Sequence, residues 1–326
     1  MRSLLLPLPV LLLALAVSGR PCPAAEPDAP LPPGVKAVWD LGKAVREKTP
    51  TRERVCLNGL WRWQPSAPGA DAVPDGRWGF FKVPGGWPGV TDYMQKDCQT
   101  VFAHPAWKGE KLGGVTSAWY QREIAVPADW AGRRIVLRVD TLNSYAAVHV
   151  DGKKAGEIRF PGGEADLTAA CRPGGRHVLS LAVAAMPLKA VLVSYNDTAA
   201  AREVKGSVAR RGLCGDVWLV GGPAGPRIAA VKVDPSVRKG ELALDTALEG
   251  LAPDAAYTLR AQIREKDRPV TELTSKPFKA GDLQGGRIAF AGTWKPDKLW
   301  DLHTPQNVYH VQLSLLDAGG KVLDAA

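Results

Sequence analysis

The sequence predicts an all-β protein made of two antiparallel β-sandwiches in series. Large and polar side chains alternate with a period of two from Trp119 to Val183, and no α-helix fits that stretch. A second set of short strands follows a Gly- and Pro-rich break at residues 221–226. Of the 326 residues, 45% are hydrophobic and 23% are charged, as in folded soluble proteins. This length allows two domains, each with its own core.

Residues 1–25 have the composition of a signal peptide. Arg2 gives a positive start, Leu4–Val17 is apolar, and small residues such as Ala24 and Ala25 offer cleavage sites. The apolar run is shorter than the roughly 20 residues that span a bilayer. We therefore expect export to the periplasm or the extracellular space, with no membrane contact after cleavage. A retained amino-terminal anchor is the alternative.

A proline-rich leader is expected over residues 26–52. Its prolines predict an extended chain. Val38, Leu41 and Val45 have near-helical spacing, so residues 35–48 form either one short helix or a segment that wraps the first sandwich.

The first sandwich is expected over residues 53–221. Asn58-Gly59 makes a turn between two strands, and Trp61 and Trp63 share a face that packs in the core. Asp151-Gly152 supplies the two positive φ angles of a type I′ hairpin turn. Further strands are expected at residues 119–126, 133–140, 145–150, 154–158 and 176–184.

Several short fragments of this domain follow one another in a distinctive order. They are Trp119-Tyr120-x-Arg122, Val126-Pro127-x-x-Trp130-x-Gly132, Val148-x-Val150-Asp151-Gly152, Gly156, Asp166-Leu167-Thr168 and Gly212-Leu213-Cys214-Gly215-Asp216-Val217-Trp218-Leu219. In this order and spacing they resemble the sugar-binding domain that begins family 2 glycoside hydrolases, which include β-galactosidases, β-glucuronidases and β-mannosidases. The resemblance implies a jelly-roll (galactose-binding-like) β-sandwich.

The second domain is expected over residues 227–326. Strands are predicted at residues 228–233, 242–248, 257–265, 270–278, 287–291, 308–316 and 321–323. Seven alternating strands are the count of an immunoglobulin-like β-sandwich. The fragment Trp294-x-Pro296-x-x-Leu299-Trp300-Asp301-x-His303-x-Pro305, followed by Val308-Tyr309, is similar to the end of the immunoglobulin-like domain that comes second in family 2.

The catalytic part of the family has no counterpart in these 326 residues. In family 2 the active site lies in a (β/α)8 barrel of roughly 250 residues that follows the immunoglobulin-like domain, and this chain stops at Ala326. The family's acid/base Glu follows an Asn, whereas the four asparagines here precede Gly, Ser, Asp and Val. The resemblance therefore implies the non-catalytic N-terminal part of an exported enzyme that hydrolyses O-glycosidic bonds, with no catalytic residue of its own. A stand-alone carbohydrate-binding protein and a scaffold that docks a separate barrel are the alternatives.

Candidate carbohydrate contacts lie after residue 82. Many family members have Asn before the tryptophan that corresponds to Trp87, and its amide contacts a sugar hydroxyl in the barrel's active site; here that position is Gly86. Sugar rings stack their C–H faces on aromatic side chains, and carboxylates accept hydrogen bonds from hydroxyls. Trp87, Asp92 and Trp107 are therefore predicted to form a sugar-facing rim. Packing of these loop residues under the sandwich is the alternative.

The expected partners are an oligo- or polysaccharide and a catalytic barrel in cis or in trans. Cys56, Cys98, Cys171 and Cys214 remain after signal cleavage and allow three disulfide pairings, or none if they are buried hydrophobes. Their spacing does not resemble a zinc site, and phosphate-binding motifs are absent, so we expect no metal and no cofactor. The net charge of +9 is spread along the chain without a nucleic-acid-binding motif, so we expect no nucleic acid partner.

Overall fold

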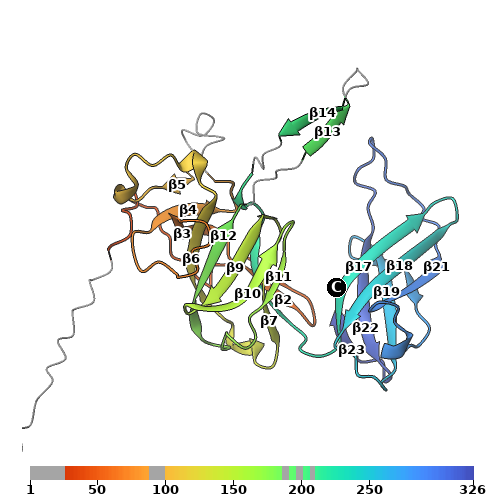
Figure 1. Cartoon of the computed structure of the whole chain (residues 1–326). Coiled ribbons are helices and arrows are strands. Elements are labelled where there is room, and N and C mark those ends of the chain that lie inside the picture. The colour runs from red at the N-terminus through yellow and green to blue at the C-terminus, as the bar shows by residue number, and fades with distance from the viewer. Residues whose placement is uncertain (1–25, 88–99, 186–190, 196–200, 206–209) are drawn as a thin grey trace, which may run out of the picture.

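The predicted all-β fold class is confirmed by a computed structural model (Figure 1). It describes residues 26–87, 100–185, 191–195, 201–205 and 210–326, of which 191–195 and 201–205 are described by their backbone alone. Strands dominate these residues, and their helices are four single 3₁₀ turns, at Pro105–Trp107, Leu112–Gly114, Ala128–Trp130 and Ala280–Asp282. None of the helices in these ranges is long and apolar enough to cross a membrane. The predicted signal peptide, Asp92 and Cys98 lie outside the described residues.

The first sandwich consists of two antiparallel sheets. The smaller has the strand order β1 (Arg46–Lys48), β2 (Glu53–Cys56), β16 (Val217–Gly222), β7 (Arg134–Val139) and β11 (Gly163–Asp166). The larger has the order β10 (Lys153–Arg159), β9 (Tyr145–Val150), β12 (Arg176–Ala184), β6 (Ser117–Ala125), β3 (Gly59–Pro65), β4 (Gly79–Val83) and β5 (Val101–Phe102). Two small pairs complete the domain: β8 (Leu142–Asn143) with β15 (Gly212–Leu213), and β13 (Val191–Tyr195) with β14 (Ala201–Lys205). The β13–β14 hairpin stands out from the sandwich in Figure 1 and lies in a segment that the sequence pattern predicts to be loop-rich.

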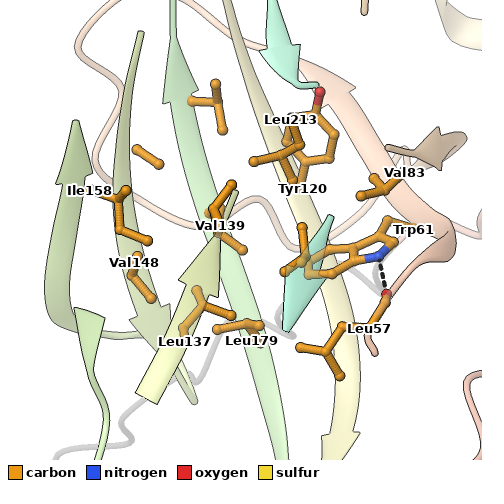
Figure 2. Packing of buried hydrophobic residues seen from close by; sticks show 14 of the residues in the cluster. Leu57, Trp61, Val83, Tyr120, Leu137, Val139, Val148, Ile158, Leu179 and Leu213 are labelled. Carbon is orange, nitrogen blue, oxygen red and sulfur yellow. Dashed lines mark hydrogen bonds between the residues drawn. The ribbon is translucent and has the colours of Figure 1, made fainter. Parts of the chain in front are cut away.

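Period-two alternation sends one side of each sheet into a shared core. Trp61 and Trp63 are both fully buried, as predicted, and the Trp61 indole N–H donates to the carbonyl oxygen of Leu57 at 2.8 Å (Figure 2). The predicted type I′ turn is confirmed as well, since Asp151 has φ 49° and Gly152 has φ 78°. These two local features explain why the strand register of the first sandwich follows the sequence pattern closely.

Residues 26–45, here called the strap, run over the outer face of the seven-stranded sheet. The strap contains no helix, so the wrapping alternative for residues 35–48 is confirmed and the helical one is wrong. Its backbone is fastened by the Ala29 N–H, which donates to the carbonyl oxygen of Trp78 at 2.7 Å. Further along, the Trp39 indole N–H donates to the carbonyl oxygen of Cys56 at 2.9 Å.

The second sandwich packs a three-stranded sheet on a four-stranded one. The first sheet has the order β17 (Arg227–Ser236), β18 (Glu241–Glu249), β21 (Arg287–Thr293), and the second β20 (Arg268–Thr274), β19 (Tyr257–Glu265), β22 (His310–Asp317), β23 (Val322–Ala325). All seven predicted strands are present, and the strand at residues 257–265 has its predicted bounds, while the other six differ from theirs by one to four residues at an end. The strand predicted to reach Phe278 ends at Thr274, and Phe278 keeps one isolated bridge to Tyr257. The strand predicted from Val308 begins at His310.

Three parts of the chain meet at the junction of the two sandwiches. The side chain of Asp324 is fully buried and accepts hydrogen bonds from the Thr51 hydroxyl at 3.0 Å and the Arg52 Nε at 2.8 Å. It also accepts a hydrogen bond from the backbone N–H of Ile228 at 2.7 Å. A buried carboxylate thus joins the end of the leader to the first and last strands of the second domain.

Candidate functional site

Gly86, where the family resemblance implies a sugar-contacting asparagine in other members, lies at one end of the first sandwich. The chain after β4 runs beside the chain before β15 there, because the Gly85 N–H donates to the carbonyl oxygen of Leu213 at 2.8 Å and the Trp87 N–H to that of Arg211 at 2.9 Å. We call this region the Gly86 edge and define it as Gly86, Trp87, Asn143, Arg210 and Arg211. The Asn143 amide donates to the carbonyl oxygen of Arg210 at 2.5 Å, which ties β8 to the same edge.

Trp87 is an internal part of this edge. Its side chain is 3% exposed, and its indole N–H donates to the hydroxyl of Tyr120 at 2.5 Å. Burial raises the pKa of Tyr120 well above its usual range, so the phenol stays neutral and serves as a hydrogen-bond partner. Arg211 places its guanidinium 5.9 Å from the centre of the Trp87 ring and donates to the carbonyl oxygen of Val115 at 2.6 Å.

Two glycines of this region, Gly212 and Gly86, differ in the space available for a side chain. Gly212 has φ +100°, and a Cβ there would lie 2.6 Å from both the Trp87 Nε1 and the Tyr120 hydroxyl oxygen. Only glycine fits such a position. At Gly86 the nearest atoms to an added Cβ belong to Arg210, at 3.9 Å. Among the described residues, packing therefore leaves room for a side chain at position 86, where glycine has none.

Trp107 is also part of the core. It is 8% exposed and packs edge-on against Trp63, with ring centres 5.6 Å apart and an interplanar angle of 79°. A Cβ at Gly79 would lie 2.6 Å from the Trp107 ring. The 3₁₀ turn that carries Trp107 is capped by His104, whose Nδ1 accepts a hydrogen bond from the Ala106 N–H at 3.1 Å.

The predicted sugar-facing rim is thus not an exposed pair of rings. Trp87 packs with Tyr120 and Trp107 packs with Trp63, and the described arrangement of both matches the alternative of packing under the sandwich. Asp92 lies outside the described residues. A contact between sugar and Trp87, Asp92 or Trp107 stays a prediction.

The motif residue Arg122 has a structural role that the sequence did not indicate. Its guanidinium is turned into the core and donates to the carbonyl oxygen of Leu57, to that of Asn58 at 2.8 Å and to that of Leu60 at 2.7 Å. Burial lowers the pKa of Arg122 to about 10, which still leaves it charged at neutral pH. It therefore holds the Asn58-Gly59 turn, where the chain passes from one sheet to the other.

Burial raises the pKa of the three cysteine thiols in the described part of the chain, which keeps them protonated at neutral pH. Cys56, Cys171 and Cys214 are free, and burial raises the pKa of the Cys171 thiol to about 12. Each of the three predicted disulfide pairings needs a bond between two of these cysteines, so none of the pairings is formed in this structure. Cys98 lies outside the described residues. Across the described ranges, no three His, Cys, Asp or Glu side chains converge as metal ligands would.

Solved structures with a similar arrangement of strands include bacterial beta-glucuronidases. Beta-glucuronidase 2 of Bacteroides uniformis, solved as a calcium binding mutant, superimposes with a TM-score of 0.56 and 21% identity over 84% of this chain and 32% of its own. The Bifidobacterium dentium beta-glucuronidase complexed with coumarin-3-O-glucuronide gives 0.58 and 19% over 86% of this chain and 48% of its own. The Ruminococcus gnavus beta-glucuronidase gives 0.59 and 16% over 86% and 45%. At these identities the likeness shows a shared fold.

Sequence comparison points to the same class. Beta-glucuronidase of Felis catus is 30% identical over 155 residues, which cover 42% of this chain and 22% of that protein, and the Canis lupus familiaris enzyme is 29% identical over 155 residues. The chain thus spans about a fifth of the length of these curated relatives. No family model matches it. The chain contains a domain like the N-terminal domain of the beta-glucuronidases, so the resemblance to family 2 glycoside hydrolases is confirmed for this part.

Proposed function

We propose that this chain forms the non-catalytic N-terminal part of an exported family 2 glycoside hydrolase. The observation that carries the proposal is the extent of the structural likeness, which takes in 84–86% of this chain but only 32–48% of each solved beta-glucuronidase. In those proteins a large further part of the polypeptide lies outside the shared sandwiches. The two domains here then support a catalytic barrel, in cis or in trans, and the barrel hydrolyses an O-glycosidic bond.

The chemistry of the Gly86 edge supports a framework role. The polar groups of this edge form hydrogen bonds inside the domain: the Trp87 indole with the Tyr120 hydroxyl, and the Arg211 guanidinium with backbone carbonyls. Gly86 has no side chain that could bind a sugar. The relative from Bifidobacterium dentium was solved with a bound glucuronide, which supports carbohydrate as the substrate class of the proposed enzyme. The composition of residues 1–25 supports export.

Three measurements test this proposal. The purified chain, assayed with nitrophenyl glucuronide, galactoside and mannoside, is expected to show no turnover, because the family's acid/base motif is absent from it; measurable turnover would contradict the non-catalytic assignment. An antibody raised against the two sandwiches is expected to detect, in the source cells, a polypeptide larger than 326 residues or a co-purifying barrel protein. N-terminal sequencing of the exported material is expected to start between Gly19 and Glu26.

A stand-alone carbohydrate-binding module without enzymatic activity is the second candidate function. It is favoured by a groove on the outer face of the seven-stranded sheet, described below. If the native protein has the length of this chain and binds glycans, this second function replaces the first.

A further inference from the structure

Three hollows on the outer face of the seven-stranded sheet join into one groove beneath the strap. The central hollow has a volume of about 390 Å³. It shares Asp28, Arg62, Gln121 and Val178 with a second hollow of about 530 Å³, and Val38, Trp39 and Glu123 with a third of about 220 Å³. The second and third hollows share no lining residue, so they lie on opposite sides of the central one. We call the whole depression the strap groove.

The residues on the floor of the strap groove lie side by side because their strands are paired in a fixed register. Phe80 of β4 is paired with Arg62 of β3, and Arg62 is paired with Gln121 of β6. On the same face, Glu123 of β6 is paired with Val178 of β12. Paired residues on adjacent strands bring their Cβ atoms to within about 5.5 Å of each other. The floor therefore crosses four strands and is elongated rather than round.

The strap supplies an apolar wall. Leu31, Val38 and Trp39 line the central hollow from the strap side. The strap is fastened before this wall by the Ala29 N–H and within the wall by the Trp39 indole N–H. Between the two anchors Val38 is 80% exposed, and Val178 on the floor is exposed as well. Uncovered apolar side chains thus face the groove from two sides.

The polar groups of the groove are held in fixed positions by one another. Arg62 donates from Nε to the Asp28 carboxylate at 2.8 Å and from Nη1 to the Gln121 side-chain oxygen at 3.0 Å. The Gln121 amide nitrogen donates to the Ser180 hydroxyl at 3.3 Å. A carboxylate accepts about four hydrogen bonds and a guanidinium donates five, so Asp28 and Arg62 keep capacity for a ligand. Fixed polar groups beside an apolar wall suit the hydroxyl groups and C–H faces of a sugar.

The charged side chains that line the groove determine whether it favours neutral or anionic ligands. Two arginines line it with their guanidinium groups, Arg62 and Arg176, while a third lining residue, Arg122, turns its guanidinium into the core. Five acidic side chains also line it, Glu26, Asp28, Asp40, Asp75 and Glu123. Four of them are paired with a base: Glu26 with Arg77, Asp28 with Arg62, Asp40 with Lys43 and Glu123 with Arg176. The groove therefore has no surplus of positive charge, although the net charge of the chain is +9. An anionic polymer gains no net electrostatic attraction there, so the groove favours a neutral one.

We propose that the strap groove binds a neutral, linear oligosaccharide of several sugar units. The position and the neutral, elongated shape of the ligand follow from the groove, and its carbohydrate nature rests also on the proposed function. The site is separate from the Gly86 edge, since no residue of that edge lines any of the three hollows. It holds a polysaccharide chain in place and takes no part in cleaving it.

Calorimetric titration of the full chain tests the site. The probes are cellohexaose, xylohexaose and mannohexaose as neutral chains, and hexagalacturonate as the anionic one. At least one neutral hexasaccharide is expected to bind, and hexagalacturonate is expected to bind at least tenfold more weakly. Equal or tighter binding of hexagalacturonate overturns the ligand class, and absence of binding by all three neutral chains at millimolar concentration overturns the site.

Variants locate the binding. The double variant Arg62→Ala/Gln121→Ala removes polar groups of the floor, and Val178→Trp fills the groove while leaving those polar groups in place; each is expected to weaken binding at least tenfold at unchanged melting temperature. Arg138→Ala is the matched control, because Arg138 is as exposed as Arg62, 48% against 47%, and pairs with Asp140 at 2.9 Å on the other sheet. Glycan binding that both groove variants leave intact would refute the groove while leaving the proposed function standing. Turnover by the purified chain would refute the proposed function without bearing on the groove.

Discussion

The two sandwiches fill their interiors differently. The first core is packed with indole rings, among them Trp61, Trp63 and Trp130, and glycines lie against several of them. A Cβ at Gly221, for example, would lie 2.4 Å from the Trp130 ring. The second core is mainly aliphatic, with Leu244, Leu259, Ile263 and Leu315 fully or almost fully buried. The first core thus depends on the fit of individual rings to individual gaps, and the second on apolar volume.

This difference explains why the two domains are recognised by different signals. In the first domain, indole rings that pack against glycines and the hydrogen bonds of Arg122 to backbone carbonyls require particular residues at particular positions. This domain therefore shows many short fragments that resemble one family. An aliphatic core accepts Leu, Ile, Val and Met in many combinations. The second domain is therefore recognised by strand count and alternation, together with the fragment near its end.

The largest expected effect separates the two cores directly. Trp61→Leu should destabilise the first sandwich by about 3–4 kcal/mol, because it opens a cavity and leaves the Leu57 carbonyl without the indole donor. Leu259→Met in the second core, a volume-conserving change, should cost less than about 1.5 kcal/mol. Urea denaturation of both variants measures the difference. Equal losses would show that both cores tolerate substitution alike.

The junction gives the next largest effect. Asp324→Ala removes the acceptor of Arg52, Thr51 and the Ile228 N–H, so a loss of about 3 kcal/mol is expected. Calorimetry should then show two separated unfolding transitions, because the contact between the sandwiches is weakened. Asp234→Ala is the control in the same domain, as its carboxylate is exposed and 3.6 Å from Lys232, and it should change stability by less than about 0.5 kcal/mol. One unchanged transition in Asp324→Ala would mean that other contacts couple the domains.

A smaller effect depends on pH and concerns the first sandwich alone. Burial by itself would raise the pKa of Asp151, but hydrogen bonds from His177 at 2.7 Å and from the Val178 N–H at 2.8 Å outweigh it and lower that pKa below 3.8. A carboxyl with a lowered folded-state pKa adds stability above its unfolded pKa and loses it as pH falls through the folded value.

Wild type should therefore exceed Asp151→Asn in free energy of unfolding by up to about 1 kcal/mol at pH 6, since half-exposed pairs contribute little. The difference should shrink below pH 4. Asn tolerates the positive φ at this turn, so the variant isolates the charge. A difference that stays constant from pH 6 to pH 3 would contradict the role of the carboxylate.

Features that depend on neighbouring residues in the sequence could be predicted, and features that depend on residues distant in the sequence could not. Periodicity placed the strands at 145–150 and 257–265 at their observed bounds, because alternation is a local signal. The β13–β14 hairpin was missed although Val191–Tyr195 is a run rich in β-forming residues, which was the available signal. In the strap the near-helical spacing of Val38 and Val45 was misleading, since both side chains are exposed.

The site was less predictable than the fold for the same reason. The burial of Trp87 depends on Tyr120 and on the missing Cβ of Gly212, which are distant in sequence. The strap groove likewise combines Arg62, Gln121 and Val178 from three strands through their register. An aromatic residue in a loop is a candidate for sugar contact, but only tertiary packing decides whether its ring faces solvent.

The smallest expected effect is at Gly86. Gly86→Asn should change the free energy of unfolding by less than about 0.5 kcal/mol, because the nearest atoms to a new Cβ lie 3.9 Å away. Gly212→Ala is the contrast within the same edge and should cost at least about 2 kcal/mol, since its Cβ would overlap both Trp87 and Tyr120. Urea denaturation of the two variants compares them under one condition. If Gly86→Asn proves as damaging as Gly212→Ala, the edge needs glycine at position 86 for packing, and the absence of the family's asparagine amide is a structural requirement rather than an open choice.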